Sequence, residues 1–540
     1  MPVLKDFGKI SKKLMSWVLA LGFLLAVSSG CTRERRLEYG LELADTLRIN
    51  ILSEPPTLDW NRSTDTTSSL IQDNIMEGLI QYDLKDPDFR LKPALATEWS
   101  SNEDFTRWVF TLREGVEWND GVPFKAEHVL ASWERLLNPQ TASEYAYFLY
   151  SLKNARLYNE GSIKDFAQVG AKVDSEGRIV VELEQPKTYF PMLLTHSSTF
   201  PIRTDVIAKH GDQWTEPENI VTLGAYNLKV WDHDRAIVLE RNENYYGEKA
   251  LVKNILAYMI NETSTALNLF DSGRLDSLHT LPSRELVHLK RRKEYRETGI
   301  MATYYFGFNT TRPPMDNVLV RRAIVHAVDR KQITDMLGGG QIPISNWVPP
   351  GMLGYEADVG LKFDADEARR LLDEAGFADR STFPTITLSF NTLEDHRRVA
   401  ENIQAQLRRN LGINVELANE EWKVYLRSLS TNPSHIYRLG WLADYPDPDN
   451  FMGIMTSFSD QNYTRWKSER YDELVRQAVA EGDPAKRQAL YVEAQRILTE
   501  EGAAVLPLFA QVNHLLVNER VQNYPVNRLA RFIFREVSLK

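Results

Sequence analysis

Three carboxylates stand close together in the sequence GWLADYPDPDN, residues 440–450. Asp444 directly follows the apolar run Gly-Trp-Leu-Ala, and Asp447 and Asp449 alternate with prolines. A carboxylate at the end of a buried segment is costly unless solvent or a positive group meets it. The pattern therefore indicates either a strand that leaves the core for solvent or a site that receives a cation.

These carboxylates do not fit a calcium loop of the EF-hand type. Such a loop requires Gly at its sixth position and a bidentate Glu at its twelfth. Counted from Asp444, these positions hold Asp449 and Met455. The ten histidines of the chain are scattered without metal-ligand spacing. We therefore expect no metal site.

Signatures of catalysis are missing from the sequence. It contains no His-Glu-x-x-His, no Gly-x-Ser-x-Gly and no Walker-type loop. The run GGGQ at 338–341 follows a helix-like segment, which indicates a helix end rather than a phosphate-binding loop. We expect that the protein is not an enzyme and needs no cofactor.

The segments around Asp444 alternate between strand and helix patterns. Apolar residues recur every four positions from Val399 to Leu411, and Gly412 follows as a natural helix end. We expect strands at 385–390, 413–418, 435–443 and 504–509, and helices at 395–412, 420–429, 470–479 and 484–502. The β-α-β-α-β order is typical of a mostly parallel sheet with helices on its faces.

This order places Asp444 at the carboxyl end of its strand, where open α/β sheets bind ligands. Trp422 is expected on the loop or helix opposite. Nearer the N-terminus, strand patterns at 46–52 and 105–118 mix with a helix near 129–137 without regular alternation. The fold class is therefore predicted to be α/β, with mixed sheets.

Aromatic residues are dense around the expected loops. Such a set either packs between lobes or walls a cleft that buries a ligand between apolar surfaces and a few polar groups. The residues are Tyr145, Tyr147, Tyr150, Tyr245, Tyr246, Tyr304, Tyr305, Trp422 and Trp441.

The overall composition limits the class of protein. The 540 residues are 43% apolar and carry a net charge of -10. Their number suggests about three or four domain-sized units. An acidic balance argues against a nucleic-acid partner.

The N-terminus has the pattern of an export signal. Four lysines fall within residues 1–13, and the apolar stretch 14–27 is too short to be comfortable as a membrane span. Cys31, the single cysteine, cannot form an internal disulfide. The sequence VSSGC resembles the bacterial lipobox, in which the cysteine is lipid-modified, although Ser28 replaces the usual leucine. We predict a signal peptide at 1–30 and a lipid anchor that holds the protein at a membrane.

Several long motifs, in the same order, carry a resemblance to a known family. The chain resembles the extracytoplasmic solute-binding proteins of the peptide/nickel family, and most of all the oligopeptide-binding proteins of bacterial ABC importers. The motifs occupy residues 93–146, 218–231, 237–247, 321–330, 368–377, 419–426 and 440–451.

The resemblance implies a fold of the periplasmic-binding-protein type, with three domains in two lobes that close over a ligand. The implied domain I is discontinuous and comprises 31–76, 204–300 and 511–540. Domain II would occupy 77–203, and domain III, the α/β lobe, 301–510.

The resemblance also implies how a peptide is held. Asp444 matches the aspartate that takes the peptide ammonium, and His396 and Arg438 match positive groups that receive the C-terminus. An arginine found in some members is replaced by Leu429. The candidate walls for side-chain pockets are Trp422, Trp441, Tyr145 and Tyr305.

The implied function is that of a lipid-anchored receptor outside the cytoplasmic membrane. It would capture short peptides as a monomer and deliver them to the permease subunits of an ABC importer. Three alternatives remain: a receptor for another solute (dipeptide, cell-wall peptide, sugar, opine or nickel chelate), a peptide sensor, and an exported hydrolase. The positions of a disulfide found in some members hold Ala302 and Leu442, so no bridge is expected.

Overall fold

The computed structural model describes residues 36–540. Among these residues, a short N-terminal unit ends at Thr46, and a large unit comprises Leu47–Lys540. The short unit contains two turns of 3-10 helix, Glu38–Gly40 and Leu43–Asp45. The predicted export signal and Cys31 lie outside the described residues.

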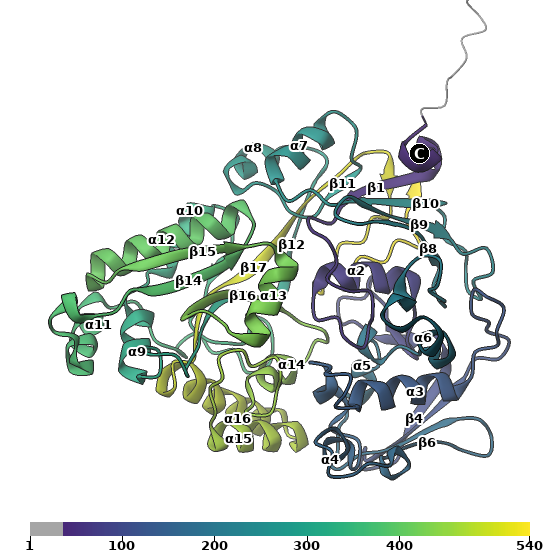
Figure 1. Ribbon diagram of the computed structural model, residues 1–540, viewed down its shortest axis with the longest axis horizontal. Helices are drawn as coiled ribbons and strands as arrows, with labels where there is room; N and C mark the ends of the chain where they lie inside the picture. The colour runs from purple at the N-terminus through teal and green to yellow at the C-terminus, as the bar shows by residue number, and fades with distance from the viewer. Residues whose placement is uncertain (1–35) are drawn as a thin grey trace, which may run out of the picture. The chain divides into compact units, whose positions relative to one another are not determined.

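The large unit is organised by one mixed eleven-stranded sheet, in the order β15-β14-β16-β12-β17-β11-β1-β10-β9-β8, with β13 paired to β17. Figure 1 shows the long strands β12 and β17 running between the two ends of this sheet. The strands are β15 Val415–Glu420, β14 Ile386–Asn391, β16 Ile436–Leu442, β12 Tyr295–Phe308, β17 Val505–Val517, β11 Ser277–Leu278, β1 Thr46–Asn50, β10 Asn254–Tyr258, β9 Ala236–Arg241, β8 Tyr226–Asp232 and β13 Ile342–Pro343.

The predicted β-α-β-α-β segment is confirmed. Strand β14 runs parallel to both β15 and β16, and the helices α12 (Glu394–Leu411) and α13 (Trp422–Thr431) connect the three strands. The four-residue apolar stripe of α12, from Val399 to Leu411, is buried in a core shared with β14. Gly412 ends α12 in the left-handed conformation, which glycine adopts without steric cost.

A separate four-stranded antiparallel sheet has the order β4-β5-β7-β6. The alternation predicted at 105–118 appears in β5 (Arg107–Leu112), where Trp108 and Phe110 face the core. Helix α3 (Ala126–Leu137) buries Val129 and Trp133 in the same apolar cluster. The other strands of this sheet are β4 Ala96–Ser101, β7 Ile179–Glu182 and β6 Ala171–Val173.

The remaining elements are short. The helices are α2 Thr66–Ile75, α4 Ala155–Asn159, α5 Phe190–Leu193, α6 Thr204–His210, α7 Thr263–Asp271, α8 Leu286–Leu289, α9 Val318–His326, α10 Arg330–Leu337, α11 Ala365–Leu372, α14 Asp449–Met452, α15 Glu469–Ala480 and α16 Pro484–Arg496. The strands are β2 Ile80–Tyr82, β3 Leu91–Pro93, β18 Val521–Gln522 and β19 Ser538–Leu539. Gly338 ends α10 in the left-handed conformation, so the start of GGGQ is a helix end, as predicted.

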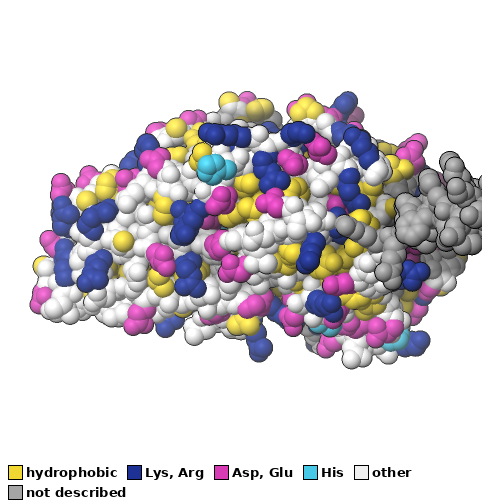
Figure 2. Space-filling model, turned by 90° about the horizontal axis from the view of Figure 1, so that it is seen from above, with side chains coloured by type: hydrophobic (Ala, Val, Ile, Leu, Met, Phe, Trp, Pro, Cys, Tyr) yellow, Lys and Arg dark blue, Asp and Glu magenta, His cyan; other side chains and the backbone are white. Residues whose placement is uncertain are grey.

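Acidic and basic side chains are interspersed over the face shown in Figure 2. None of the described helices is both long enough and apolar enough to cross a membrane.

Candidate functional site

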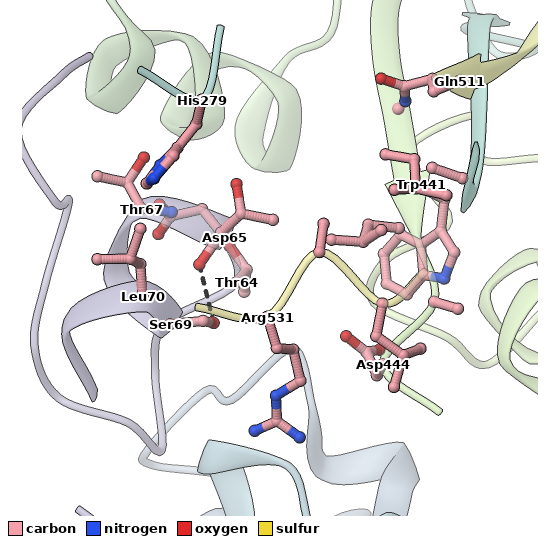
Figure 3. Close-up of a pocket in the computed structure, with 18 of the residues that line it drawn as sticks. Thr64, Asp65, Thr67, Ser69, Leu70, His279, Trp441, Asp444, Gln511 and Arg531 are labelled. Carbon is pink, nitrogen blue, oxygen red and sulfur yellow. Dashed lines mark hydrogen bonds between the residues drawn. The ribbon is translucent and has the colours of Figure 1, made fainter. Parts of the chain in front are cut away.

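A cavity of about 360 Å³ lies beside the carboxyl end of β16. Its longest lining stretches are 438–444 in and after β16, 64–67 at the start of α2, and 529–532 near the C-terminus. Figure 3 shows Asp65 and His279 on one side of the space and Trp441 and Asp444 on the other. The volume lies within the range of small-molecule sites, roughly 300–1,000 Å³.

The strand beside the cavity has an unpaired edge. Strand β16 pairs with β12 from Ile436 to Leu442, but β14 contacts it only at Ile436 and Tyr437. Within residues 36–540, no other strand pairs with β16 on the side of β14. The carbonyl of Arg438 accepts a hydrogen bond from the Tyr425 hydroxyl at 2.7 Å, so the main-chain groups of 439–442 on that side are the ones available to a further extended chain.

Asp444 lies just after the end of this strand, and its side chain is largely buried, with 14% exposed. The side-chain amide of Asn450 donates to its Oδ2 at 3.0 Å, and the hydroxyl of Tyr145 lies 3.4 Å from the same oxygen. In the described chain, the basic side chain nearest to Asp444 is that of His196, whose Nε2 lies 3.5 Å from Oδ1 of the aspartate. Burial raises the pKa of Asp444 to about 7. Burial also lowers the pKa of His196 to about 3, so this imidazole supplies no positive charge at neutral pH.

Arg438 is the corresponding buried cation. Its Nη1 donates to the side-chain oxygen of Asn391 at 3.2 Å, and its guanidinium lies 4.3 Å from the centre of the Tyr304 ring. Its Nε has no hydrogen-bond partner, and no carboxylate of the described chain forms an ion pair with it. The cavity is thus bordered by a largely buried carboxylate and a buried guanidinium that are not paired with each other.

The structure brings five of the seven predicted ligand residues to the cavity. These are Asp444, Arg438, Trp422, Trp441 and Tyr145.

His396 and Tyr305 do not line the cavity. The Nδ1 of His396 lies 3.1 Å from the hydroxyl of Tyr304, and burial lowers its pKa well below the usual value. Tyr305 packs edge-on against Trp347, with ring centroids 4.7 Å apart. Successive side chains of a strand point to opposite faces, so Tyr304 packs into one apolar cluster, beside Arg438, and Tyr305 packs into another.

The comparisons with known proteins agree with this architecture. The sequence profile of the bacterial extracellular solute-binding proteins, family 5 Middle, matches residues 90–463. The chain belongs to family 5 of the bacterial extracellular solute-binding proteins. The proteins of family 5 are transport receptors and not enzymes.

Individual relatives match almost the whole chain. The periplasmic oligopeptide-binding protein OppA of Salmonella typhimurium is 33% identical over 535 residues, 96% of each chain. The probable deoxycholate-binding periplasmic protein YgiS of Escherichia coli is 31% identical over 505 residues, 91% of this chain and 93% of its own. The crystal structure of Haemophilus influenzae OppA in complex with RPPGFSPFR superposes with a TM-score of 0.87 at 29% identity, covering 92% of this chain and 99% of that one. The predicted fold of the periplasmic-binding-protein type is confirmed.

In this family 5 chain, the other two carboxylates of the DYPDPDN segment have structural partners. Asp447 forms an ion pair with Arg487 at 2.7 Å. Asp449 accepts hydrogen bonds from Tyr189 at 2.7 Å and Tyr445 at 3.1 Å. No group of three or more potential metal ligands occurs in the described part of the chain.

Sequence reasoning missed a second set of lining residues in the family 5 protein. They include Asp65, Asp73, His196, His279, Tyr463 and Arg531. Asp65 lies in the polar run NRSTDTTSS, which offers a helix-cap signal but none for a ligand. Arg531 forms its ion pair with Asp73 across 458 residues, and no local pattern indicates such a contact.

Proposed function

We propose that the protein captures short peptides in this cavity and delivers them to the permease of an ABC importer. One observation carries the proposal: Arg438 is buried and Asp444 largely so, the two are opposite in charge, neither is paired with a charged group of the described chain, and both border one cavity. A peptide is a zwitterion that can neutralise both. Leaving either charge buried and unpaired costs several kcal/mol.

The unpaired edge of β16 supports a peptide over other zwitterions. An extended peptide can hydrogen-bond to such an edge through its main chain, which supplies affinity independent of its sequence. Trp422, Trp441 and Tyr145 would then form the walls for its side chains. We propose that His396 acts indirectly, because it holds the hydroxyl of Tyr304, over whose ring Arg438 lies.

We also propose the three-domain division and closure by hinge motion. The division is supported by the two sheets: β4–β7 all fall within 77–203, and β14–β16 fall within 301–510. Contacts such as Tyr189 with Asp449 join these two parts of the chain. A peptide that makes contacts on both parts would favour the closed state.

The test is to identify what the protein binds. The soluble chain without residues 1–31, purified without denaturation, is analysed by native mass spectrometry beside an Asp444→Asn variant. We expect a spread of adduct masses that match short peptides and that are strongly reduced in the variant. A single non-peptide adduct that is equally abundant in the variant would refute the peptide assignment.

A bile acid is the informative competitor, because the relative YgiS is a probable deoxycholate-binding protein. Deoxycholate has a carboxylate for Arg438 but no ammonium for Asp444. Calorimetric titration with deoxycholate and with a tripeptide separates the two ligands, and we expect heat of binding from the tripeptide alone.

We further propose that Cys31 carries the lipid anchor and that the anchored protein works as a monomer outside the cytoplasmic membrane. Expression of the full chain in a bacterial host, with cell fractionation, tests the anchor. We expect the wild type in the membrane fraction and a Cys31→Ser variant in the soluble fraction. Equal partition of both proteins would contradict the anchor.

A further inference from the structure

The charges around the cavity do not balance even when a zwitterion is bound. Five charged side chains of the described chain border it: Asp65, Asp73, Asp444, Arg438 and Arg531. Asp73 and Arg531 neutralise each other in a two-pronged ion pair, with N–O distances of 2.7 and 3.0 Å. Asp65, Asp444 and Arg438 remain.

The two histidines that border the cavity do not change this balance. Burial lowers the pKa of both His196 and His279 to about 3. Both imidazoles are therefore neutral at physiological pH. A peptide ammonium would neutralise Asp444 and a peptide carboxylate would neutralise Arg438, which leaves Asp65 without a positive partner.

Asp65 has only neutral donors around it. Its Oδ1 accepts from the backbone N–H groups of Thr67 and Ser68, at 3.0 and 3.1 Å, and from the indole Nε1 of Trp422 at 3.3 Å. Within residues 36–540, its Oδ2 accepts only from the Ser68 hydroxyl, at 2.6 Å. The residue is 6% exposed, and no Lys, Arg or His of the described chain forms an ion pair with it. Burial raises its pKa, because the carboxylate is desolvated.

We propose that Asp65 and Trp422 form a subsite for a cationic side chain, so that the preferred ligand is a peptide with a lysine or an arginine. This inference rests on the proposed function. It assigns a specificity-determining role to Asp65, which is separate from the ammonium site at Asp444. Figure 3 shows the two carboxylates on different walls, Asp65 at the start of α2 and Asp444 beyond β16.

The chemistry of the pair suits a long basic side chain. Oδ2 of Asp65 has one partner and can accept another hydrogen bond from an ammonium or guanidinium group. The indole of Trp422 borders the cavity next to this carboxylate. An aromatic face attracts a cation and covers the methylene stem that leads to it.

The competing explanation is that Asp65 serves only as the N-cap of α2. Asparagine caps helices as well as aspartate does, so Asp65→Asn removes the charge and keeps the cap. Asp329 is a matched control, because it caps α10 through the N–H groups of Lys331 and Gln332 but lies outside the cavity. Asp329→Asn should leave all binding constants unchanged.

The experiment is calorimetric titration of the chain without residues 1–31 at pH 7.5. The ligands are trialanine and its variants with one lysine, one arginine or one glutamate at each position. For the wild type we expect the best lysine or arginine peptide to bind roughly 10- to 100-fold tighter than trialanine, which is the range of a hydrogen bond to a charged group. In Asp65→Asn this preference should fall to less than threefold, while trialanine affinity stays within threefold of the wild type.

Two results would overturn the inference alone: peptide binding by the wild type without preference for a basic side chain, or a preference that survives in Asp65→Asn. Binding of no peptide at all would instead refute the proposed function. Should Asp65→Asn fail to fold, Trp422→Leu provides the second test. It leaves the Asp65 cap in place, and the preference for the basic peptide over trialanine should shrink. An unchanged preference in that variant would also overturn the inference.

Discussion

The hydroxyl of Tyr463 donates a hydrogen bond to the carboxylate of Glu144, although 319 residues separate them in the chain. Tyr463 borders the cavity, and so does Tyr145, the neighbour of Glu144. Burial raises the pKa of Glu144 from 4.5 to about 7. This contact joins residues 77–203 to residues 301–510 beside the proposed peptide site, and its strength depends on pH.

Replacement of Glu144 by glutamine should stabilise the protein in alkaline buffer. A buried acid whose pKa is raised by folding destabilises the fold progressively between its unfolded and folded pKa, and by a constant amount above the folded value. The shift from 4.5 to about 7 corresponds to at most about 3 kcal/mol at pH 8. Glutamine keeps an acceptor for Tyr463 without the charge. Differential scanning fluorimetry should give a higher Tm for Glu144→Gln at pH 8 and a much smaller difference at pH 5.

Exposed Glu103 provides the control for this comparison. Glu103→Gln should shift the Tm by the same small amount at both pH values. Equal Tm values of Glu144→Gln and the wild type at pH 8 would mean that Glu144 is ionised at little cost.

Asp444 should be coupled to the amino terminus of the ligand. Calorimetry with a free tripeptide and its N-acetylated form, on the wild type and on Asp444→Asn, forms a thermodynamic cycle. Loss of one partner from a buried ion pair costs about 3–5 kcal/mol. We therefore expect acetylation to weaken wild-type binding more than 100-fold and to have little effect on the variant. The pairing is contradicted if acetylation costs both proteins the same.

Peptide affinity should have a maximum between pH 7 and 8. The ligand-free Asp444 has a pKa of about 7, and an ammonium favours its ionised form, so binding releases a proton at lower pH. Affinity should then fall by up to about tenfold for each pH unit below 7. It should fall again above about pH 8, where a peptide amino group loses its proton. Titrations from pH 5 to 9, in two buffers of different ionisation enthalpy, measure the decline of affinity on both sides of the maximum. The Asp444→Asn variant should lose the decline below pH 7.

The buried carboxylate of Asp276 should affect the free energy of unfolding rather than ligand binding. Arg48 contacts both of its oxygens, at 2.9 and 2.7 Å, and Arg520 donates to Oδ1 at 2.9 Å. Asp276→Asn leaves these guanidinium groups without their counter-charge and should cost about 3–5 kcal/mol. Urea denaturation should show the loss, while peptide affinity of the folded fraction stays unchanged. The exposed pair of Asp366 and Arg369 gives the control, since Asp366→Asn should not change the denaturation midpoint measurably.

Sequence patterns predicted the β-α-β-α-β part well because the helices α12 and α13 that connect its strands each have one buried face. The stripe from Val399 to Leu411 in α12 and the position of Asp444 after β16 both follow from such patterns. They did not distinguish Tyr304 from Tyr305, because β12 is buried on both faces from Met301 onward, and neither tyrosine lines the cavity. His396 lies three residues before Val399 on the buried stripe, so helix periodicity alone indicates burial for it.

Contacts between residues that lie hundreds of positions apart in the sequence could not be predicted from local patterns. The segment 529–532 borders the cavity only because the chain returns there after β17, and Arg531 then meets Asp73. Asp65 is a comparable case, since the same carboxylate is suited to cap a helix with or without a ligand beside it.

The unpaired edge of β16 has a consequence for what competes with the ligand. Exposed strand edges invite pairing with the edges of other proteins and so promote aggregation. Here the open part of the edge faces a cavity of about 360 Å³. We expect such a space to exclude a strand of a folded neighbour and the middle of a long polypeptide. For the proposed peptide site, we therefore expect the dimensions of the cavity to select short fragments over whole proteins, while the strand edge itself tolerates any sequence.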